Sequence, residues 1–166
     1  MIPGVVLSRQ AAHADDRGRF VEVFRAAGQP ARFVQANHSR SGAGVLRGLH
    51  YHRHQSDLWY VVSEHAQVAL VDLRARVPRP QISVMVLRDD NPSTLFIPPG
   101  VAHGFLALSD VDLIYWVTHE YDASDEYGIA WDDPALAIAW EADDPILSDR
   151  DKENPNLQWE LIPSFL

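Results

Sequence analysis

Short runs of β-branched, aromatic and aliphatic residues recur along most of this chain, and turn-forming residues separate them. Each run has about the length of one strand, and segments rich in Gly, Pro, Asp and Asn, such as ARVPRPQ and DDNPST, break the chain between runs. Helical periodicity is weak throughout. The pattern therefore predicts an all-β sandwich or barrel. The runs are FVEVF, RFVQANHS, VLRGLHYH, LWYVV, QVALVDLR, QISVMVLR, TLFIPPG, HGFLALS and DLIYWVTHEY.

The length of 166 residues and the hydrophobic content of 46% allow one sizeable core, so we predict a single domain over residues 1–166. The last third changes character, because WDDPALAIAWEADDPILSDRDKENPNLQW mixes tryptophans, prolines and acidic turns. Leaving its apolar side chains in water would be costly, so we expect this segment to wrap against the barrel. The side chains concerned are Trp131, Trp140, Ile146, Leu147 and Trp159.

The composition excludes several functions. The formal net charge of −9 argues against a broad face for nucleic acid or a membrane surface, although Arg17, Arg47 and Arg53 could still form a local pocket for a small anion. The chain opens MIPGVVLSRQ, without a signal-peptide pattern, and no apolar run approaches roughly 18 residues, so we expect a cytoplasmic protein. Cysteine is absent, which leaves His, Asp and Glu as candidate metal ligands.

The stretch GLHYHRHQSDLW places three histidines at alternate positions, His50, His52 and His54, and Asp57 follows them. Alternate residues of a strand share a face, so the three imidazoles would point the same way if the strand extends to His54. Two interpretations stay open. Together with a carboxylate, the imidazoles could hold a divalent first-row ion. Alternatively, His52 and His54 are surface residues at a strand end or turn, since polar residues interleave them.

Parts of the metal-binding cupin signature can be read around these histidines. Gly44, His50, His52 and Asp57 fit its first half, Gly-x5-His-x-His-x(3,4)-Glu, with aspartate in place of glutamate. The segment PPGVAHG fits the second half, Pro-x-Gly-x-x-His, and ends at His103; four residues later the signature has asparagine where this chain has alanine. This resemblance implies, as an alternative function, a metal-dependent cupin enzyme with His50, His52, Asp57 and His103 as ligands.

A longer set of segments resembles the dTDP-4-dehydrorhamnose 3,5-epimerase family in order and spacing. They run from about Asp15 to Asp151 and read DDRGRFVEVF, FVQANHSRSGAGVLRGLHYH, VDLR, FIPPGVAHGFLALSD, YGIAWDDP and ILSDRD. The resemblance implies a cupin-type jelly-roll barrel with a short irregular or helical segment near the C-terminal end. It also implies a homodimer in which the N-terminal hairpin reaches into the neighbouring subunit's site.

The resemblance further implies an isomerase that inverts C3, C5 or both in a dTDP-4-keto-6-deoxyhexose, without a cofactor. A proton next to a ketone can be removed because the carbanion is delocalised as an enolate, so the site needs a base, an acid on the opposite face and a group that stabilises the oxyanion. By resemblance His50 is the base, Tyr115 is the acid, and Asp151 orients the imidazole. A module that only binds sugar would need no such pair.

The same resemblance implies a set of residues that bind the substrate. Guanidinium groups match phosphate oxygens, and an aromatic ring can stack on a nucleobase. The implied set is Arg17, Phe20 and Glu22 from the N-terminal hairpin, with Gln35, Asn37, Arg47, Asp57, His103, Tyr121 and Arg150.

The chain departs from the family's pattern at two positions. Asp57 stands where the resemblance places a lysine near the sugar, and His52 stands where it places glutamine. A carboxylate beside a developing enolate would raise the barrier through charge repulsion. Three alternatives follow. Arg53, or a protonated His52 or His54, supplies the positive charge. A divalent ion held through His52 and Asp57 replaces the lysine as a Lewis acid. Or catalysis has been lost or changed, for example to a keto-isomerase acting on the same kind of nucleotide sugar.

Overall fold

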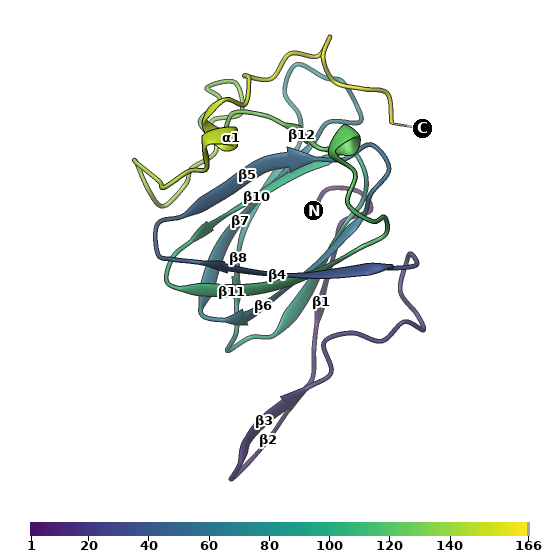
Figure 1. Ribbon diagram of the computed structural model, residues 1–166, viewed down its shortest axis with the longest axis vertical. Coiled ribbons are helices and arrows are strands. Elements are labelled where there is room, and N and C mark those ends of the chain that lie inside the picture. Colours follow the sequence, from purple (N-terminus) through teal and green to yellow (C-terminus); the bar gives the residue numbers. More distant parts are fainter. Residues whose placement is uncertain (166) are drawn as a thin grey trace.

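The computed structural model describes residues 1–165 and consists almost entirely of β-strands; Leu166, the last residue of the predicted domain, lies outside the described residues. Two five-stranded antiparallel sheets face each other as a jelly roll, and a two-stranded hairpin projects from one end (Figure 1). This arrangement confirms the prediction of an all-β, cupin-type barrel. None of the helices in residues 1–165 is long and apolar enough to cross a membrane.

The strand order of each sheet brings together segments that are distant in the sequence. The first sheet contains, in order, β1 (Val6–Arg9), β9 (Ser93–Ile97), β6 (Asp57–Ser63), β11 (Val111–Val117) and β4 (Gln35–Ser41). The second contains β12 (Tyr127–Gly128), β5 (Leu46–Tyr51), β10 (Val101–Ala107), β7 (His65–Asp72) and β8 (Ile82–Arg88). The hairpin pairs β2 (Ala12–Asp15) with β3 (Gly18–Val21), and the helical turns are η1 (Ala123–Asp125) and α1 (Asp149–Lys152).

Several of the predicted strand runs end earlier than their composition indicates, and two of these lie close to candidate site residues. FVEVF is extended only to Val21, because Phe24 leaves the hairpin and stacks on Trp116, with ring centroids 5.2 Å apart. β5 ends at Tyr51, so the strand does not extend to His54, as a shared face for the three alternate histidines would require. The turn that follows is held by Asp125, whose carboxylate accepts hydrogen bonds from the backbone N–H groups that come directly after His52.

Strand β7 is buried on both faces, and the alternation along it separates two cores. Neighbouring side chains of a strand point to opposite faces. Val68 and Leu70 pack in the core between the two sheets, whereas Ala69 and Val71 pack in a second core. The second core lies on the outer face of this sheet, beneath the C-terminal segment. A sheet covered on both faces needs a near-continuous apolar run, and QVALVDL supplies one.

The C-terminal segment covers the second core, as its tryptophans predict. Trp140 and Trp159 are half-buried against this core, and the Trp140 indole donates a hydrogen bond to the Trp131 carbonyl at 3.0 Å. The exception is Ile146, whose side chain is 62% exposed. Its backbone instead forms a bridge beside β5, where its N–H donates to the Gly44 carbonyl. This bridge leads the chain into α1, close to β5.

Candidate active site

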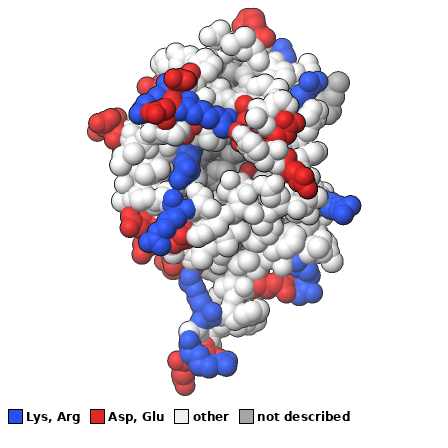
Figure 2. Space-filling model, in the orientation of Figure 1, with Lys and Arg blue, Asp and Glu red and all other residues white. Residues whose placement is uncertain are grey.

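The open end of the barrel interior forms a pocket of about 430 Å³. In the space-filling view it is a hollow between the two sheets, bordered by arginine and acidic side chains (Figure 2). Strand alternation decides which side chains reach it. On β5, Leu49 and Tyr51 face the second core, so His50 between them faces the interior. On β6, Asp57 and Trp59 share the interior face, since both line the pocket.

Gly48 lets β5 lie against β10 next to this histidine. Its φ is +126°, and a Cβ built on it would lie 2.6 Å from the Gly104 Cα and 2.9 Å from the His103 carbonyl oxygen. The register between the two strands shifts here: His50 pairs with His103, while the partner of Arg47 lies two residues further along β10. The extra residue in β5 turns both Arg47 and His50 toward the pocket.

His50 is held by a buried carboxylate from the C-terminal segment. Its Nε2 lies 2.6 Å from Asp151 Oδ1. Asp151 belongs to α1, and its backbone N–H donates to the Ser148 hydroxyl that caps this turn. Burial acts to raise the pKa of Asp151, but hydrogen bonds from His50, Ser148 and the Gly48 N–H, with the charge of His50, bring this pKa below its usual value. The ionised carboxylate can therefore orient the imidazole and stabilise its protonated form.

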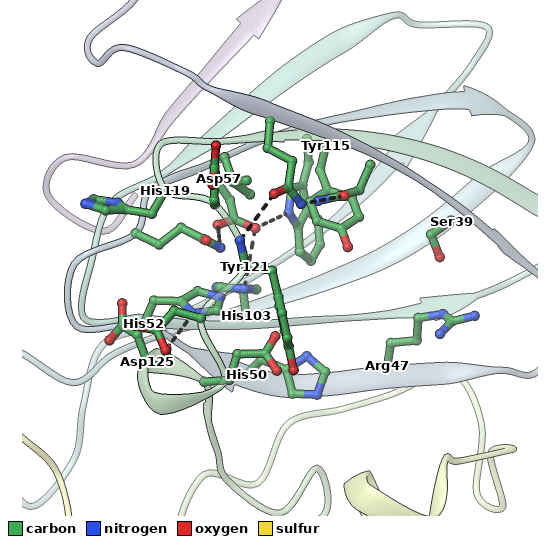
Figure 3. Close-up of a pocket in the computed structure, with 18 of the residues that line it drawn as sticks. Ser39, Arg47, His50, His52, Asp57, His103, Tyr115, His119, Tyr121 and Asp125 are labelled. Atoms are coloured by element: carbon green, nitrogen blue, oxygen red, sulfur yellow. Dashed lines mark hydrogen bonds and ion pairs between the residues drawn. The ribbon is translucent and has the colours of Figure 1, made fainter.

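Tyr115 faces the same pocket from the other sheet. It lies on β11, opposite Trp59 of β6 and Asn37 of β4, and Figure 3 shows it across the pocket from His50. Burial raises the pKa of the Tyr115 phenol, and the negative charges of Asp57 and Glu126 raise it further. The phenol is therefore protonated at neutral pH. A ligand in this pocket would have a basic imidazole on one side and a proton donor on the other.

A buried polar cluster lies beside these two residues. His52, Asp57 and His103 each offer one ligand atom, and these atoms lie within 4.8 Å of one another. The surface interpretation is therefore right for His54, which is exposed, and wrong for His52, which is buried. Of the four ligands in the metal-dependent alternative, the structure brings together these three, while the Nε2 of His50 is bonded to Asp151.

The pocket contains most of the predicted substrate-binding residues. Those that line it are Gln35, Asn37, Arg47, Asp57, His103 and Tyr121. Arg150 lies at the rim, where it forms an ion pair with Glu126 at 2.6 Å. The three hairpin residues lie outside this pocket. Arg17 pairs with Asp15, Glu22 pairs with Arg25, and the Phe20 side chain is 67% exposed.

Several lining residues were not predicted from the sequence. Ser39 could have been predicted, because it lies on the same face of one strand as Gln35 and Asn37. The larger group comes from the acidic segment after β11, whose residues carry no motif of their own. They are His119, Glu120, Asp122, Asp125 and Glu126. Only their position in the sequence could have indicated them, because this segment follows β11 directly and β11 ends at the pocket with Val117.

A sequence profile of the dTDP-4-dehydrorhamnose 3,5-epimerase family matches residues 1–158. The chain belongs to this family. It is 38% identical over 163 residues to the dTDP-4-dehydrorhamnose 3,5-epimerase of Pseudomonas aeruginosa, which covers 92% of this chain and 90% of that protein. It is 41% identical over 146 residues to the spore coat polysaccharide biosynthesis protein SpsL of Bacillus subtilis, covering 84% of this chain and 97% of that protein.

The fold agrees with solved structures of such epimerases. The crystal structure of the Legionella pneumophila enzyme in complex with dTDP-4-keto-L-rhamnose matches with a TM-score of 0.87 at 35% identity, over 98% of this chain and 94% of that chain. Family, jelly-roll fold and isomerase class are thus as the sequence motifs predict. Among the residues that line the pocket in the described chain, Arg47 is the only arginine or lysine, against five carboxylates.

Proposed function

We propose that this protein inverts C3, C5 or both in a dTDP-4-keto-6-deoxyhexose by removing and returning a proton through an enolate. One observation carries the proposal: the His50–Asp151 pair and the protonated Tyr115 face one pocket from opposite sheets. Inversion of a carbon next to a ketone needs a base on one face of the sugar and an acid on the other. A site that only binds a sugar does not.

In the proposed reaction, His50 takes the proton from a carbon beside the C4 ketone. The electron pair of the broken C–H bond moves into the ring, and negative charge develops on the carbonyl oxygen. Asp151 stabilises the imidazolium that forms, since its carboxylate is buried, ionised and hydrogen-bonded to the ring. Tyr115 then donates its phenolic proton to the opposite face of the same carbon. Both proton transfers use side chains of the chain itself and need no cofactor.

We propose that Gln35, Asn37, Arg47 and Tyr121 bind the nucleotide and sugar, because all four line the pocket around the base and acid. A diphosphate carries more negative charge than Arg47 alone neutralises, and the pocket's carboxylates add to it. Further cations must therefore come from outside this pocket. The nearby Arg150 is one, and its ion pair with Glu126 holds it at the rim.

We propose that, in a homodimer, the hairpin residues supply the remaining contacts to the nucleotide. Arg17, Phe20 and Glu22 lie outside their own chain's pocket, on a hairpin that projects away from the barrel (Figure 1). An exposed phenylalanine and an exposed arginine on such an arm suit contact with the nucleotide of a neighbouring subunit. In a symmetric dimer each arm would complete the partner's site.

Mixed dimers test this arrangement. Arg17→Ala and His50→Asn each lower epimerisation as homodimers. In a co-expressed mixture, one pocket of each mixed dimer combines an intact His50 with an intact hairpin from the other chain, so we expect activity to reappear. If the hairpin serves its own chain, no mixed dimer holds an intact site and activity stays low. Light scattering then reports whether the protein is a dimer.

The function itself is tested by proton NMR of dTDP-4-keto-6-deoxyglucose with the protein in deuterated water. We expect loss of the C3 signal, the C5 signal or both, with formation of an epimer. Which signals exchange identifies the carbons that His50 serves. Migration of the ketone from C4 to C3 would identify a keto-isomerase, and an unchanged spectrum would overturn the proposal.

A further inference from the structure

The cluster of His52, Asp57 and His103 brings three hydrogen-bond acceptors together in a buried wall of the pocket (Figure 3). The side chains are 7%, 3% and 5% exposed, respectively. His103 and Asp57 approach to 3.9 Å between Nε2 and Oδ2, which is too far for a hydrogen bond. The proposed proton transfers use none of the three. Their arrangement therefore needs an explanation of its own.

The two imidazoles are fixed in the same tautomer by backbone carbonyls. The Nδ1–H of His52 donates to the Asp125 carbonyl at 2.8 Å, and the Nδ1–H of His103 donates to the Val101 carbonyl at 3.0 Å. A neutral imidazole carries only one N–H, so Nε2 of each ring then presents a lone pair.

Asp57 adds a buried carboxylate to the cluster. Its Oδ1 accepts a hydrogen bond from Gln55 Nε2 at 2.9 Å, and its Oδ2 accepts one from Trp59 Nε1 at 3.1 Å. Within residues 1–165, its only basic neighbour at ion-pair distance is His103. A cation among these atoms would offset the cost of burying a carboxylate opposite two imidazole lone pairs.

We propose that His52, Asp57 and His103 bind a first-row divalent cation through two imidazole Nε2 atoms and one carboxylate oxygen. This donor set suits Zn²⁺, Co²⁺ and neighbouring ions. Metal–ligand distances of about 2.0 to 2.2 Å place ligand atoms about 3 to 4 Å apart, so small side-chain rotations close the observed spacing. The carbonyls of Asp125 and Val101 already orient the rings, as outer partners of metal-bound histidines do.

The remaining coordination positions face the pocket, since all three ligands line it. His50 stays outside the set because Asp151 holds it, although it pairs with His103 across β5 and β10. A cation here would offset the charge of Asp57 and could polarise the sugar's ketone, favouring the enolate. That catalytic role rests on the proposed function; binding of the cation does not.

Titration of the chelator-treated full-length protein with Co²⁺ and Zn²⁺ tests the proposal. We expect one ion per chain, visible ligand-field absorption from bound Co²⁺, and displacement of Co²⁺ by Zn²⁺ in calorimetry. His52→Gln and Asp57→Asn should each weaken binding at least about tenfold. His54→Gln is the matched control, because it makes the same change at an exposed position two residues away and should leave affinity unchanged. Circular dichroism verifies that each variant is folded.

Two results would overturn the inference: a wild-type protein that binds neither ion stoichiometrically, or folded His52→Gln and Asp57→Asn variants with wild-type affinity. If a variant does not fold, nitrogen-15 histidine spectra of the wild type decide. Zn²⁺ must shift the Nε2 signals of two histidines, and unshifted signals contradict the site. Metal binding without deuterium exchange would leave this inference standing and remove the proposed function. Deuterium exchange by a protein that binds no metal would support the proposed function and overturn this inference.

Discussion

His50 and Asp151 lie 2.6 Å apart between Nε2 and Oδ1, although 101 positions of sequence separate them. The C-terminal segment thus provides the partner of the proposed base. We predict that Asp151→Asn slows solvent deuterium exchange into the substrate by about 10² to 10⁴-fold, because the neutral amide lacks the negative charge with which the carboxylate stabilises the imidazolium. Proton NMR of the keto sugar in deuterated water measures this rate.

Asp149→Asn is the control for this prediction. It makes the same chemical change in the same helical turn, at a side chain that is 97% exposed and forms an ion pair with Lys152. We expect its exchange rate to equal that of the wild type. Equal rates for Asp151→Asn and Asp149→Asn, in folded proteins, would show that the buried carboxylate does not assist His50.

Tyr115→Phe separates the removal of the proton from its return. His50 remains able to take a proton and give it back on the same face, whereas the opposite face loses its donor. We therefore expect deuterium to enter the substrate while the yield of epimer falls at least about a hundredfold. NMR reports both quantities in one experiment. Undiminished epimer formation would assign the acid to another residue, and loss of both quantities together would indicate that Tyr115 acts in binding.

Ionisation of Tyr115 should occur at unusually high pH. Burial, followed by the charges of Asp57 and Glu126, raises its pKa above the usual value of about 10, against a smaller opposing effect of Arg47. The ultraviolet absorbance of chelator-treated wild type and Tyr115→Phe is measured as a function of pH. The difference between the two curves gives the ionisation of Tyr115 alone. Asp57→Asn should lower the midpoint, because a phenolate forms more easily without a neighbouring negative charge. A wild-type midpoint at or below 10 contradicts this prediction.

Asp57→Lys tests whether the pocket lacks positive charge. In chelator-treated protein, we expect the variant to epimerise faster than the wild type, since an ammonium group stabilises the enolate and a carboxylate repels it. Added Zn²⁺ should accelerate the wild type and leave the variant unchanged. Asp57→Asn, which removes one charge and adds none, should be intermediate. If the folded lysine variant epimerises more slowly than the chelator-treated wild type, the Asp57 carboxylate itself takes part in the reaction or in binding.

Gly48→Ala should damage both stability and catalysis. The new Cβ would overlap the Gly104 backbone, and the φ of +126° is strained for any other residue. We expect a loss of at least about 2 kcal/mol in the free energy of unfolding. Gly44→Ala is the control, because Gly44 also has a positive φ but no atom within 4 Å of the added Cβ; it should cost about 1 kcal/mol. Urea denaturation measures both, and equal losses would exclude a steric role for Gly48.

Most strands of the two sheets could be predicted, because each has at least one buried face that alternation or an apolar run reveals. β1 and β2 were missed for the same physical reason: all their residues are exposed, and they pair through the backbone at a sheet edge or in the hairpin. Such strands leave no hydrophobic pattern. Their pairing depends on tertiary context.

The candidate site was predictable where residues lie on regular strands. His50 and Tyr115 fall on inward positions of β5 and β11. The burial of His52 was not predictable, because it depends on a loop far along the chain: Asp125 bonds both the imidazole and the backbone after it. No local pattern reports a contact between residues 73 positions apart.

The placement of Asp151 on α1 also has a consequence for the order in which the protein is made. A ribosome completes every strand of the barrel before it reaches α1. His50 and all the strands are therefore synthesised before the segment that supplies the carboxylate. The proposed catalytic pair can therefore form only after every strand of the barrel has been synthesised.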